Sequence, residues 1–325
     1  MLRRSFLPLA AWMALGAPLA RAQQDFPRSG KPVRIIVGFA PGGPTDIQAR
    51  ALANEMGKLL PVPVIVENKP GASGGIGAME VVRAEPDGHT LMYISDGVVT
   101  QNPHTLKSVP YDPFRDFTPI AQLTAGGVVL VMHPSVPAAS LKEFIAYGKT
   151  NPGKLAYASF GVGTVSHIYG EVLRLNTGID IVHVPYKGSA EALKDLLAGR
   201  VQIMFDSPST AAQYAREGRL RILGSAGEKR RSLMPDTPTL LELGLPGFEI
   251  RGWNGLFGPA NMNDAVLQKL HATVATASRT RNFRDMLALM AFDPVDDTPA
   301  EFAKVVRRDY DRWGMYIRRA NIQLE

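Results

Sequence analysis

Short apolar runs rich in β-branched residues alternate with segments of helical spacing along most of the chain. In the first part, the apolar runs are 33–37, 64–66, 90–94 and 120–123, and the helical stretches lie near 46–60 and 75–84. Strands that alternate with helices in this way are typical of α/β units with mostly parallel sheets. The first part of the chain therefore predicts one α/β unit.

A second set of the same kind begins at Val128. Its predicted strands are 128–132, 155–158, 181–184, 201–205 and 220–224, and its predicted helices lie near 140–149, 164–176, 189–198 and 210–217. A short helix at 239–243 and a strand-like segment at 249–257 are expected to follow. The pattern thus predicts a second α/β unit after the first.

The last part of the chain is predicted to be largely helical, with apolar positions such as Phe283, Leu287 and Phe302 at helical spacing. It contains too little strand for a third unit, so we expect residues 261–325 to fold back over the first unit. The second unit is then inserted between crossings near 124–127 and 250–253. This arrangement predicts one lobe of residues 23–125 with 251–325, a second lobe of residues 126–250, and a hinged cleft between them.

The N-terminus has the features of an export signal. Arg3 and Arg4 precede an apolar stretch from Phe6 to Leu19, and a small-residue cleavage pattern ends at Ala22. We expect residues 1–22 to be removed, because the stretch is shorter than a membrane span needs and contains two prolines. Export by the general or by the twin-arginine route stays open. The chain has no cysteine, so neither an N-terminal lipid anchor on cysteine nor a disulfide is possible, and a periplasmic protein is expected.

The charge gives no indication of a nucleic-acid partner. The chain has 36 Lys and Arg residues against 30 Asp and Glu residues, a net charge of +6, and removal of the three arginines of the signal leaves +3. The six histidines are scattered without metal-ligand spacing. We therefore expect no nucleic acid, no metal and no cofactor, and a monomer.

A glycine-rich turn, 38–46, connects the first predicted strand to the first predicted helix. A strand, a glycine-rich turn and a helix start leave backbone N–H groups free at the positive end of the helix, where an anion binds well. The turn has no Lys or Arg, so peptide dipoles and neutral donors would hold the anion. Asp46 is also favourable there simply through the helix dipole. A plain tight turn of an α/β protein is the alternative interpretation.

A second glycine-rich loop, 70–77, precedes the next predicted helix and contains Ser73. Its sequence also matches G-x-S-x-G, the nucleophile elbow of α/β hydrolases. That motif must follow its strand at once, whereas residues 67–70 intervene here. An exported hydrolase using Ser73 is thus a weaker alternative to a binding loop.

The second predicted unit has the same order of strand, turn and helix start at residues 157–167. There a strand, a flexible turn and Thr164 precede a helix. The next two strands end at 183–189, with Tyr186 and Lys187, and at 204–207, with Asp206. In open α/β sheets, ligands bind beyond the carboxyl ends of the strands, where all these loops lie. Because all these loops lie at strand ends of this kind, they favour one shared binding site.

Taken together, several long motifs resemble the tripartite tricarboxylate transporter receptor family, the Bug-type periplasmic solute-binding proteins. The motifs are PGGPTD at 41–46, VENKPGA at 66–72, AEPDGHTL at 84–91, HVPYKG at 183–188, PDTPT at 235–239 and GLFGPA at 255–260. The resemblance covers essentially the whole mature chain. It implies a two-lobe periplasmic-binding-protein fold of the Venus flytrap type II, which captures a small carboxylate for possible delivery to membrane permease subunits.

Carried onto this sequence, the resemblance implies ligand contacts from both lobes and no catalysis. Phe160 stands where the family usually has a small residue, so a ligand with an apolar or aromatic face is favoured over a plain dicarboxylate or tricarboxylate. Which carboxylate is bound, and whether the protein serves transport or a sensing membrane kinase, stay open. The expected contacts are Phe39, Ala40, Pro41, Gly42, Gly43, Thr45, Asp46, Ser73, Gly74, Gly75, Ser95, Ser159, Phe160, Gly161, Gly163, Thr164, Tyr186, Lys187 and Asp206.

Overall fold

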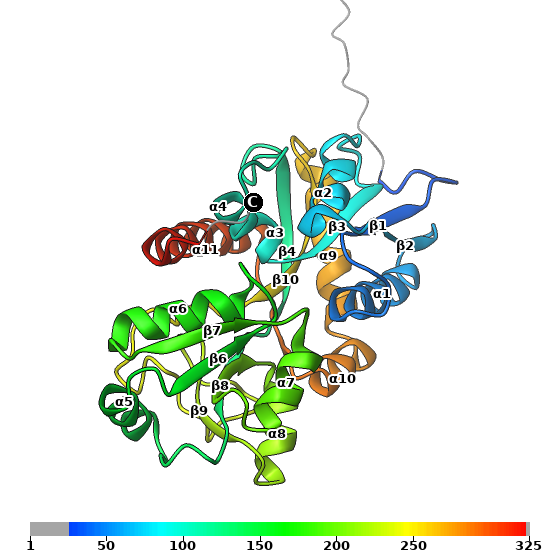
Figure 1. Ribbon diagram of the computed structural model, residues 1–325. Helices are drawn as coiled ribbons and strands as arrows, with labels where there is room; N and C mark the ends of the chain where they lie inside the picture. The colour runs from blue at the N-terminus through cyan, green and yellow to red at the C-terminus, as the bar shows by residue number, and fades with distance from the viewer. Residues whose placement is uncertain (1–25, 323–325) are drawn as a thin grey trace, which may run out of the picture.

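The computed structural model describes residues 26–322 and contains two β-sheets, each covered by helices (Figure 1). The predicted export signal, residues 1–22, lies outside the described residues. Within 26–322, no helix is both long enough and apolar enough to cross a membrane.

The first sheet has six strands in the order β11-β4-β10-β3-β1-β2. β1 pairs in parallel with β2 and β3, whereas β10 runs antiparallel between β3 and β4. The strands are β1 (Val33–Val37), β2 (Val64–Asn68), β3 (Thr90–Ser95), β4 (Phe117–Ala125), β10 (Trp253–Pro259) and β11 (Asp293–Pro294). Its helices are α1 (Pro44–Gly57), α2 (Gly75–Val82), α3 (Gly97–Thr100), α4 (Asn102–Thr105), α9 (Asp264–Ser278) and α10 (Arg281–Leu289), with a 3₁₀ turn at Ala72–Gly74.

The second sheet has five strands in the order β7-β6-β8-β5-β9. β6 pairs in parallel with β7 and β8, and β5 runs antiparallel to β8 and β9. The strands are β5 (Val129–Met132), β6 (Leu155–Ser159), β7 (Ile181–Pro185), β8 (Ile203–Asp206) and β9 (Arg221–Ser225). The helices are α5 (Leu141–Thr150), α6 (Val165–Thr177), α7 (Ser189–Leu197) and α8 (Pro208–Arg216).

Most predicted elements are present, with two local differences. Residues 239–243 form a single hydrogen-bonded turn instead of the predicted short helix, because Gly244 has a φ of +82° and ends the turn. The strand expected within 249–257 begins only at Trp253, since residues 250–252 form the return crossing between the sheets. Both differences arise where the chain turns between larger elements.

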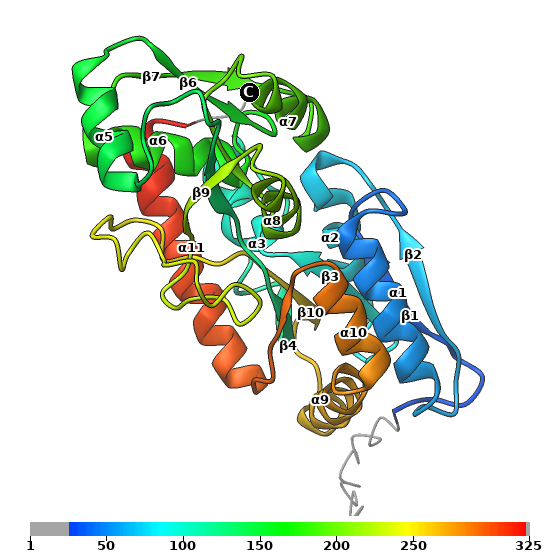
Figure 2. The same cartoon turned by 90° about the horizontal axis from the view of Figure 1, so that it is seen from below.

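The long helix α11 (Pro299–Ala320) contributes to both halves of the molecule. Phe302 and Val306 lie in an apolar cluster with residues of the first sheet, whereas Trp313 and Ile317 lie in the main cluster of the second. Figure 2 shows α11 running from beside β4 to beside α6. The tail therefore covers the first unit as expected only up to the middle of α11, because its last turns complete the core of the second. The lobe bounds 23–125 with 251–325 and 126–250 remain a proposal, with α11 shared.

A polar cluster joins the two halves beside the crossings. The Arg231 guanidinium, which is 1% exposed, donates to the carbonyls of Gly126 and Ala291 and lies 3.8 Å from Asp293. Asp293 also pairs with Arg251. Because Gly126 and Arg251 belong to the two crossings, this cluster fixes the crossings against the segment before β11.

Candidate ligand-binding site

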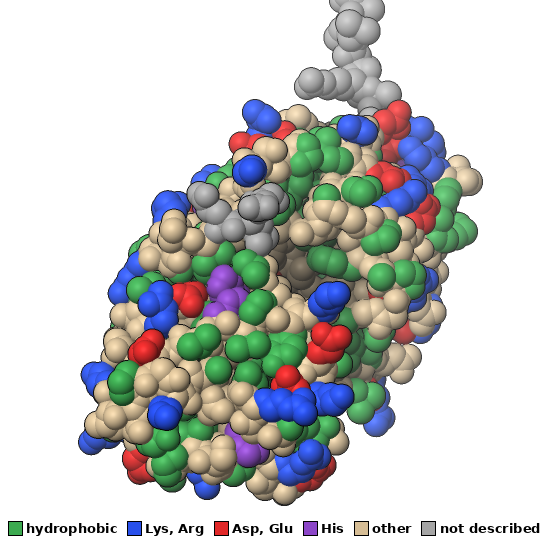
Figure 3. Space-filling model, in the orientation of Figure 1, with side chains coloured by type: hydrophobic (Ala, Val, Ile, Leu, Met, Phe, Trp, Pro, Cys, Tyr) green, Lys and Arg blue, Asp and Glu red, His purple; other side chains and the backbone are tan. Residues whose placement is uncertain are grey.

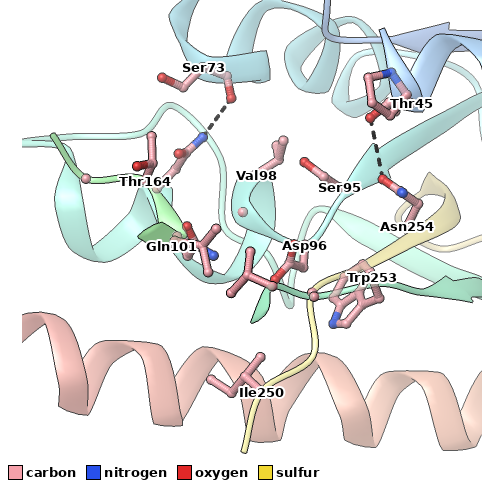
Figure 4. A pocket seen from close by; sticks show the side chains of 18 of the residues that line it. Thr45, Ser73, Ser95, Asp96, Val98, Gln101, Thr164, Ile250, Trp253 and Asn254 are labelled. Atoms are coloured by element: carbon pink, nitrogen blue, oxygen red, sulfur yellow. Dashed lines mark hydrogen bonds between the residues drawn. The ribbon is translucent and has the colours of Figure 1, made fainter. Parts of the chain in front are cut away.

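A cavity of about 430 Å³ lies between the two sheets and receives residues from both halves and both crossings. The molecular surface is hollowed between the two halves (Figure 3), and Figure 4 shows the lining from close by. The first half contributes the loop after β1 and the end of β3, and the second contributes residues 162–165 before α6. The cavity therefore lies at the carboxyl ends of strands β1, β3 and β6, where ligands gather in α/β proteins.

Two helix N-termini meet at this cavity from opposite sides. α1 begins after Gly43 and α6 begins after Thr164, and neither helix has a side-chain cap on its first N–H groups. Thr45 of α1 and Val165 of α6 line the cavity. Because the first-turn N–H groups of a helix lack partners within it, both ends present positive dipole charge to the same space.

Polar side chains of the first half surround the end of α1. Ser73, Ser95 and Gln101 line the cavity. Gln101 is only 9% exposed, and among the described residues its side-chain amide has no hydrogen-bond partner. Asn102 Nδ2 donates to the carbonyl of Ser73 at 2.9 Å and fixes that loop (Figure 4). An amide that lines a cavity and has no hydrogen-bond partner in the protein is a site for a ligand hydrogen bond.

The lining contains no Lys, Arg or His, and its only carboxylate is Asp96. An anion in the cavity would therefore be held by backbone N–H groups, hydroxyls and amides rather than by an ion pair, as expected from the composition of the turn at 38–46. Within residues 26–322, no group of three potential metal ligands is present.

Asp96 lies at the end of β3 and is 8% exposed. Burial, and then the neighbouring Asp309 carboxyl, raise the pKa of Asp96 to about 7. The same carboxyl ionises near 3.8 when it is fully solvated, as in the unfolded chain. Between these two pH values the folded protein holds a proton that the unfolded chain has released, so the stability contributed at this site falls as pH rises from about 4 to 7.

Asp96→Asn is accordingly expected to be more stable than the wild type at pH 8 and nearly equal to it at pH 4.5, because the amide carries no charge that must be buried. Thermal unfolding of both proteins across this pH range measures the difference. Asp285→Asn, which changes an exposed carboxyl on α10, is the control and should leave the pH profile unchanged. An equal gain in melting temperature at both pH values would contradict the assignment.

Six of the residues expected from the sequence line the cavity: Phe39, Thr45, Ser73, Ser95, Gly163 and Thr164. The rest of the first loop, residues 40–43 with Asp46, does not. Asp46 is 3% exposed and accepts hydrogen bonds from the Gly42 N–H at 2.9 Å and from Asn68 Nδ2 at 2.8 Å. Its carboxylate therefore holds the loop in shape and does not line the cavity.

Gly74 and Gly75 also lie behind the cavity wall, for a steric reason. A Cβ on Gly38 would stand 2.8 Å from the Cα of Gly74, and a Cβ on Gly77 would stand 2.9 Å from the Cα of Gly38. The glycines thus let the two loops touch backbone to backbone. This close packing places Phe39 and Ser73 at the cavity.

In the second half, six expected contacts do not line the cavity. Ser159 is fully buried, with its Oγ 2.7 Å from His183 Nε2. The Tyr186 hydroxyl donates to Asp195 at 2.8 Å, and Asp206, whose pKa is raised by burial, accepts from the Ser189 hydroxyl at 3.1 Å. Phe160 packs with Val184 and Tyr186 against an apolar cluster behind β6. Gly161 and Lys187 are likewise absent from the cavity lining.

Several lining residues were not expected from the sequence. Asp96 follows Ser95 directly and could have been found by the strand-end rule that pointed to the other loops. Gln101 and Asn102 come from short helical turns, Trp253 and Asn254 come from the start of β10, and Phe292 comes from the segment before β11. No glycine-rich turn or local motif marks these positions.

Comparisons with known proteins agree on one receptor family. Residues 48–322 match the family described as "Tripartite tricarboxylate transporter family receptor". A Cupriavidus necator protein described as "UPF0065 protein in gbd 5'region" is 38% identical over 94% of this chain and 93% of its own, and the Bordetella pertussis protein BugT is 31% identical over 91% of each. An R. palustris protein solved with adipate superposes with a TM-score of 0.76 at 29% identity, covering 92% of this chain and all of its own.

Proposed function

The chain belongs to the tripartite tricarboxylate transporter receptor family, and from this premise we propose that it captures a small organic carboxylate in the cavity between its lobes for uptake by a tripartite tricarboxylate-type transporter. The resemblance to Bug-type receptors and the two-lobe solute-binding fold are confirmed. The family consists of binding receptors rather than enzymes. The proposed location is the periplasm, after cleavage near Ala22.

The alternative of a hydrolase using Ser73 has no support in the geometry. Among the described residues, no histidine or carboxylate is hydrogen-bonded to Ser73. The serine follows β2 only after Lys69 to Ala72, so it does not form a nucleophile elbow.

The observation that supports carboxylate capture is the convergence of two uncapped helix N-termini, from α1 and α6, on a cavity without a basic side chain. The carboxylate accepts hydrogen bonds from first-turn N–H groups beside Thr45 and Val165 and from the free donors of Ser73, Ser95 and Gln101. Hydrogen bonds to an ionised acceptor are stronger than neutral ones, and they strengthen further where water is excluded. Closure of the lobes on the ligand completes the donor set, because the donors come from both.

The test is a thermal-shift panel of monocarboxylates, dicarboxylates, tricarboxylates, aromatic acids, nicotinate-like acids and amino acids. An acid that binds the folded state stabilises it by about 2.7 kcal/mol at 100 times its Kd. We expect at least one acid to raise the melting temperature and its amide, which lacks the charge, to have no effect. A panel in which every acid is inert would refute carboxylate capture.

A further inference from the structure

The floor and far wall of the cavity are apolar. Val98, Val128, Ile250, Trp253 and Phe292 line it, and Figure 4 shows Ile250 and Trp253 below the polar group of Thr45, Ser73 and Ser95. A ligand whose carboxylate lies at the helix N-termini therefore has its remaining atoms against hydrocarbon. Apolar surface on the ligand gains free energy there, whereas a second polar group finds few partners.

The charge near this floor is negative. Asp96 is the only carboxylate of the lining, and Asp309 of α11 stands close enough to raise the pKa of Asp96. Asp309 accepts from Trp253 Nε1 at 3.0 Å and is paired with the partly exposed Arg308 at 2.8 Å.

The other groups around Asp96 supply no cation to the cavity. Trp313 of α11 and the Tyr169 hydroxyl, which donates to the carbonyl of Ile250 at 2.6 Å, are neutral. The guanidinium groups of Arg231 and Arg251 do not line the cavity, and both lie near Asp293. Nothing in the lining neutralises a negative group at the far end of a ligand.

We propose that the cavity selects a monocarboxylate with an apolar body, and that Asp96 excludes a dicarboxylate of the same length. The inference rests on the proposed function, since it assumes that one carboxylate is held at the helix N-termini. By analogy with the R. palustris protein that was solved with adipate, a dicarboxylate ligand would be expected instead. Asp96 acts as a specificity residue through its charge, because a second ligand carboxylate would lie in an apolar environment beside a like charge.

This selection depends on pH in a defined direction. Burial and the Asp309 carboxyl raise the pKa of Asp96 to about 7, so Asp96 is largely protonated at pH 6 and ionised at pH 8. Aliphatic carboxylic acids have pKa values near 4 to 5 and stay ionised at both pH values. Rejection of the dicarboxylate should therefore be weaker at pH 6 and stronger at pH 8.

The experiment is calorimetric titration with two matched pairs, hexanoate with adipate and 4-methylbenzoate with terephthalate, at pH 6 and pH 8. For the wild type at pH 8, we expect the monocarboxylate of at least one pair to bind more than about tenfold tighter than its dicarboxylate, and the ratio to shrink at pH 6. Asp96→Asn should reduce the ratio to about threefold or less and remove its pH dependence. Asp285→Asn makes the same change of net charge at an exposed residue outside the cavity lining and should behave as the wild type.

The inference is overturned if in neither pair the monocarboxylate binds tighter than its dicarboxylate, if both monocarboxylates fail to bind, or if Asp96→Asn leaves the ratio unchanged. The wild-type comparison needs no variant, and Asp96→Ser replaces Asp96→Asn if the latter does not fold. Binding of a dicarboxylate alone would refute this selection and leave the proposed function intact. Failure of every acid in the wider panel would refute the proposed function itself.

Discussion

Thr45→Asp should lower the affinity for the best acid of the thermal-shift panel by about 100-fold, because it places a fixed carboxylate at the N-terminus of α1 where the ligand carboxylate is expected. Two like charges about 5 Å apart repel by roughly 3 kcal/mol at the effective dielectric of a partly buried site. That free energy corresponds to a loss of about two orders of magnitude in affinity. Isothermal titration calorimetry measures the change.

The fold should tolerate this substitution. Thr45 is the second residue of α1, and an acidic side chain in the first turn is favourable to a helix. Thr45 makes only one long hydrogen bond, 3.5 Å to Asn254 Oδ1, so little is lost with its hydroxyl.

Thr45→Asn is the matched control, since it has the same shape as the aspartate without its charge. Its affinity should stay within about threefold of the wild type. If Thr45→Asp and Thr45→Asn bind the acid equally well, the carboxylate does not lie at the α1 terminus, and the proposed binding geometry is wrong.

The elements that the sequence predicted well are those with local signals. The strand at 33–37 and the helix after Gly43 follow from an apolar run, a glycine turn and helical spacing within about 25 residues of chain. The strand-end rule then placed Thr45, Ser73 and Thr164 near one site before any contact was known. Glycine turns were informative because their conformation depends on few neighbours.

The loop before α6 shows what the sequence could not reveal. Its composition suggested several free N–H groups, but Phe160 N–H donates to Ser166 Oγ at 2.9 Å and Gly163 N–H donates to His167 Nδ1 at 3.0 Å. Thr164 N–H donates to the carbonyl of Gly161. The loop therefore satisfies much of its own hydrogen bonding, and it is the first turn of α6 that keeps N–H groups for a ligand. Such internal pairing depends on side-chain placement that no spacing pattern encodes.

Long-range contacts account for the remaining site residues. Trp253 and Phe292 are about 210 and 250 residues away in sequence from the turn at 38–46, and the topology of β10 and β11 brings them to the same cavity. The apolar floor, on which the selection against dicarboxylates depends, comes largely from these segments. The sequence suggested an apolar ligand through Phe160, whereas the structure assigns the apolar surface to other side chains.

Truncation of Trp313 to alanine is expected to destabilise the protein by about 3 to 5 kcal/mol. Trp313 is fully buried, with its ring centroid 5.1 Å from that of Tyr169 and 6.2 Å from that of Tyr316. α11 is continuous between the apolar cluster of the first half, at Phe302, and the cluster that contains Trp313. Loss of this side chain therefore weakens the second core and also the packing of α11 against it.

Met315→Ala is the matched control, because Met315 is on the same helix but 50% exposed, and its loss should change the stability by less than about 0.5 kcal/mol. Urea unfolding followed by tryptophan fluorescence and by circular dichroism measures both variants. Tyr169 lines the cavity, so Trp313→Ala should also weaken acid binding, whereas Met315→Ala should not. If Trp313→Ala lowers the free energy of unfolding by less than about 1 kcal/mol, the last turns of α11 are dispensable to the second core. Removal of a well-packed buried tryptophan destabilises a protein by more than this.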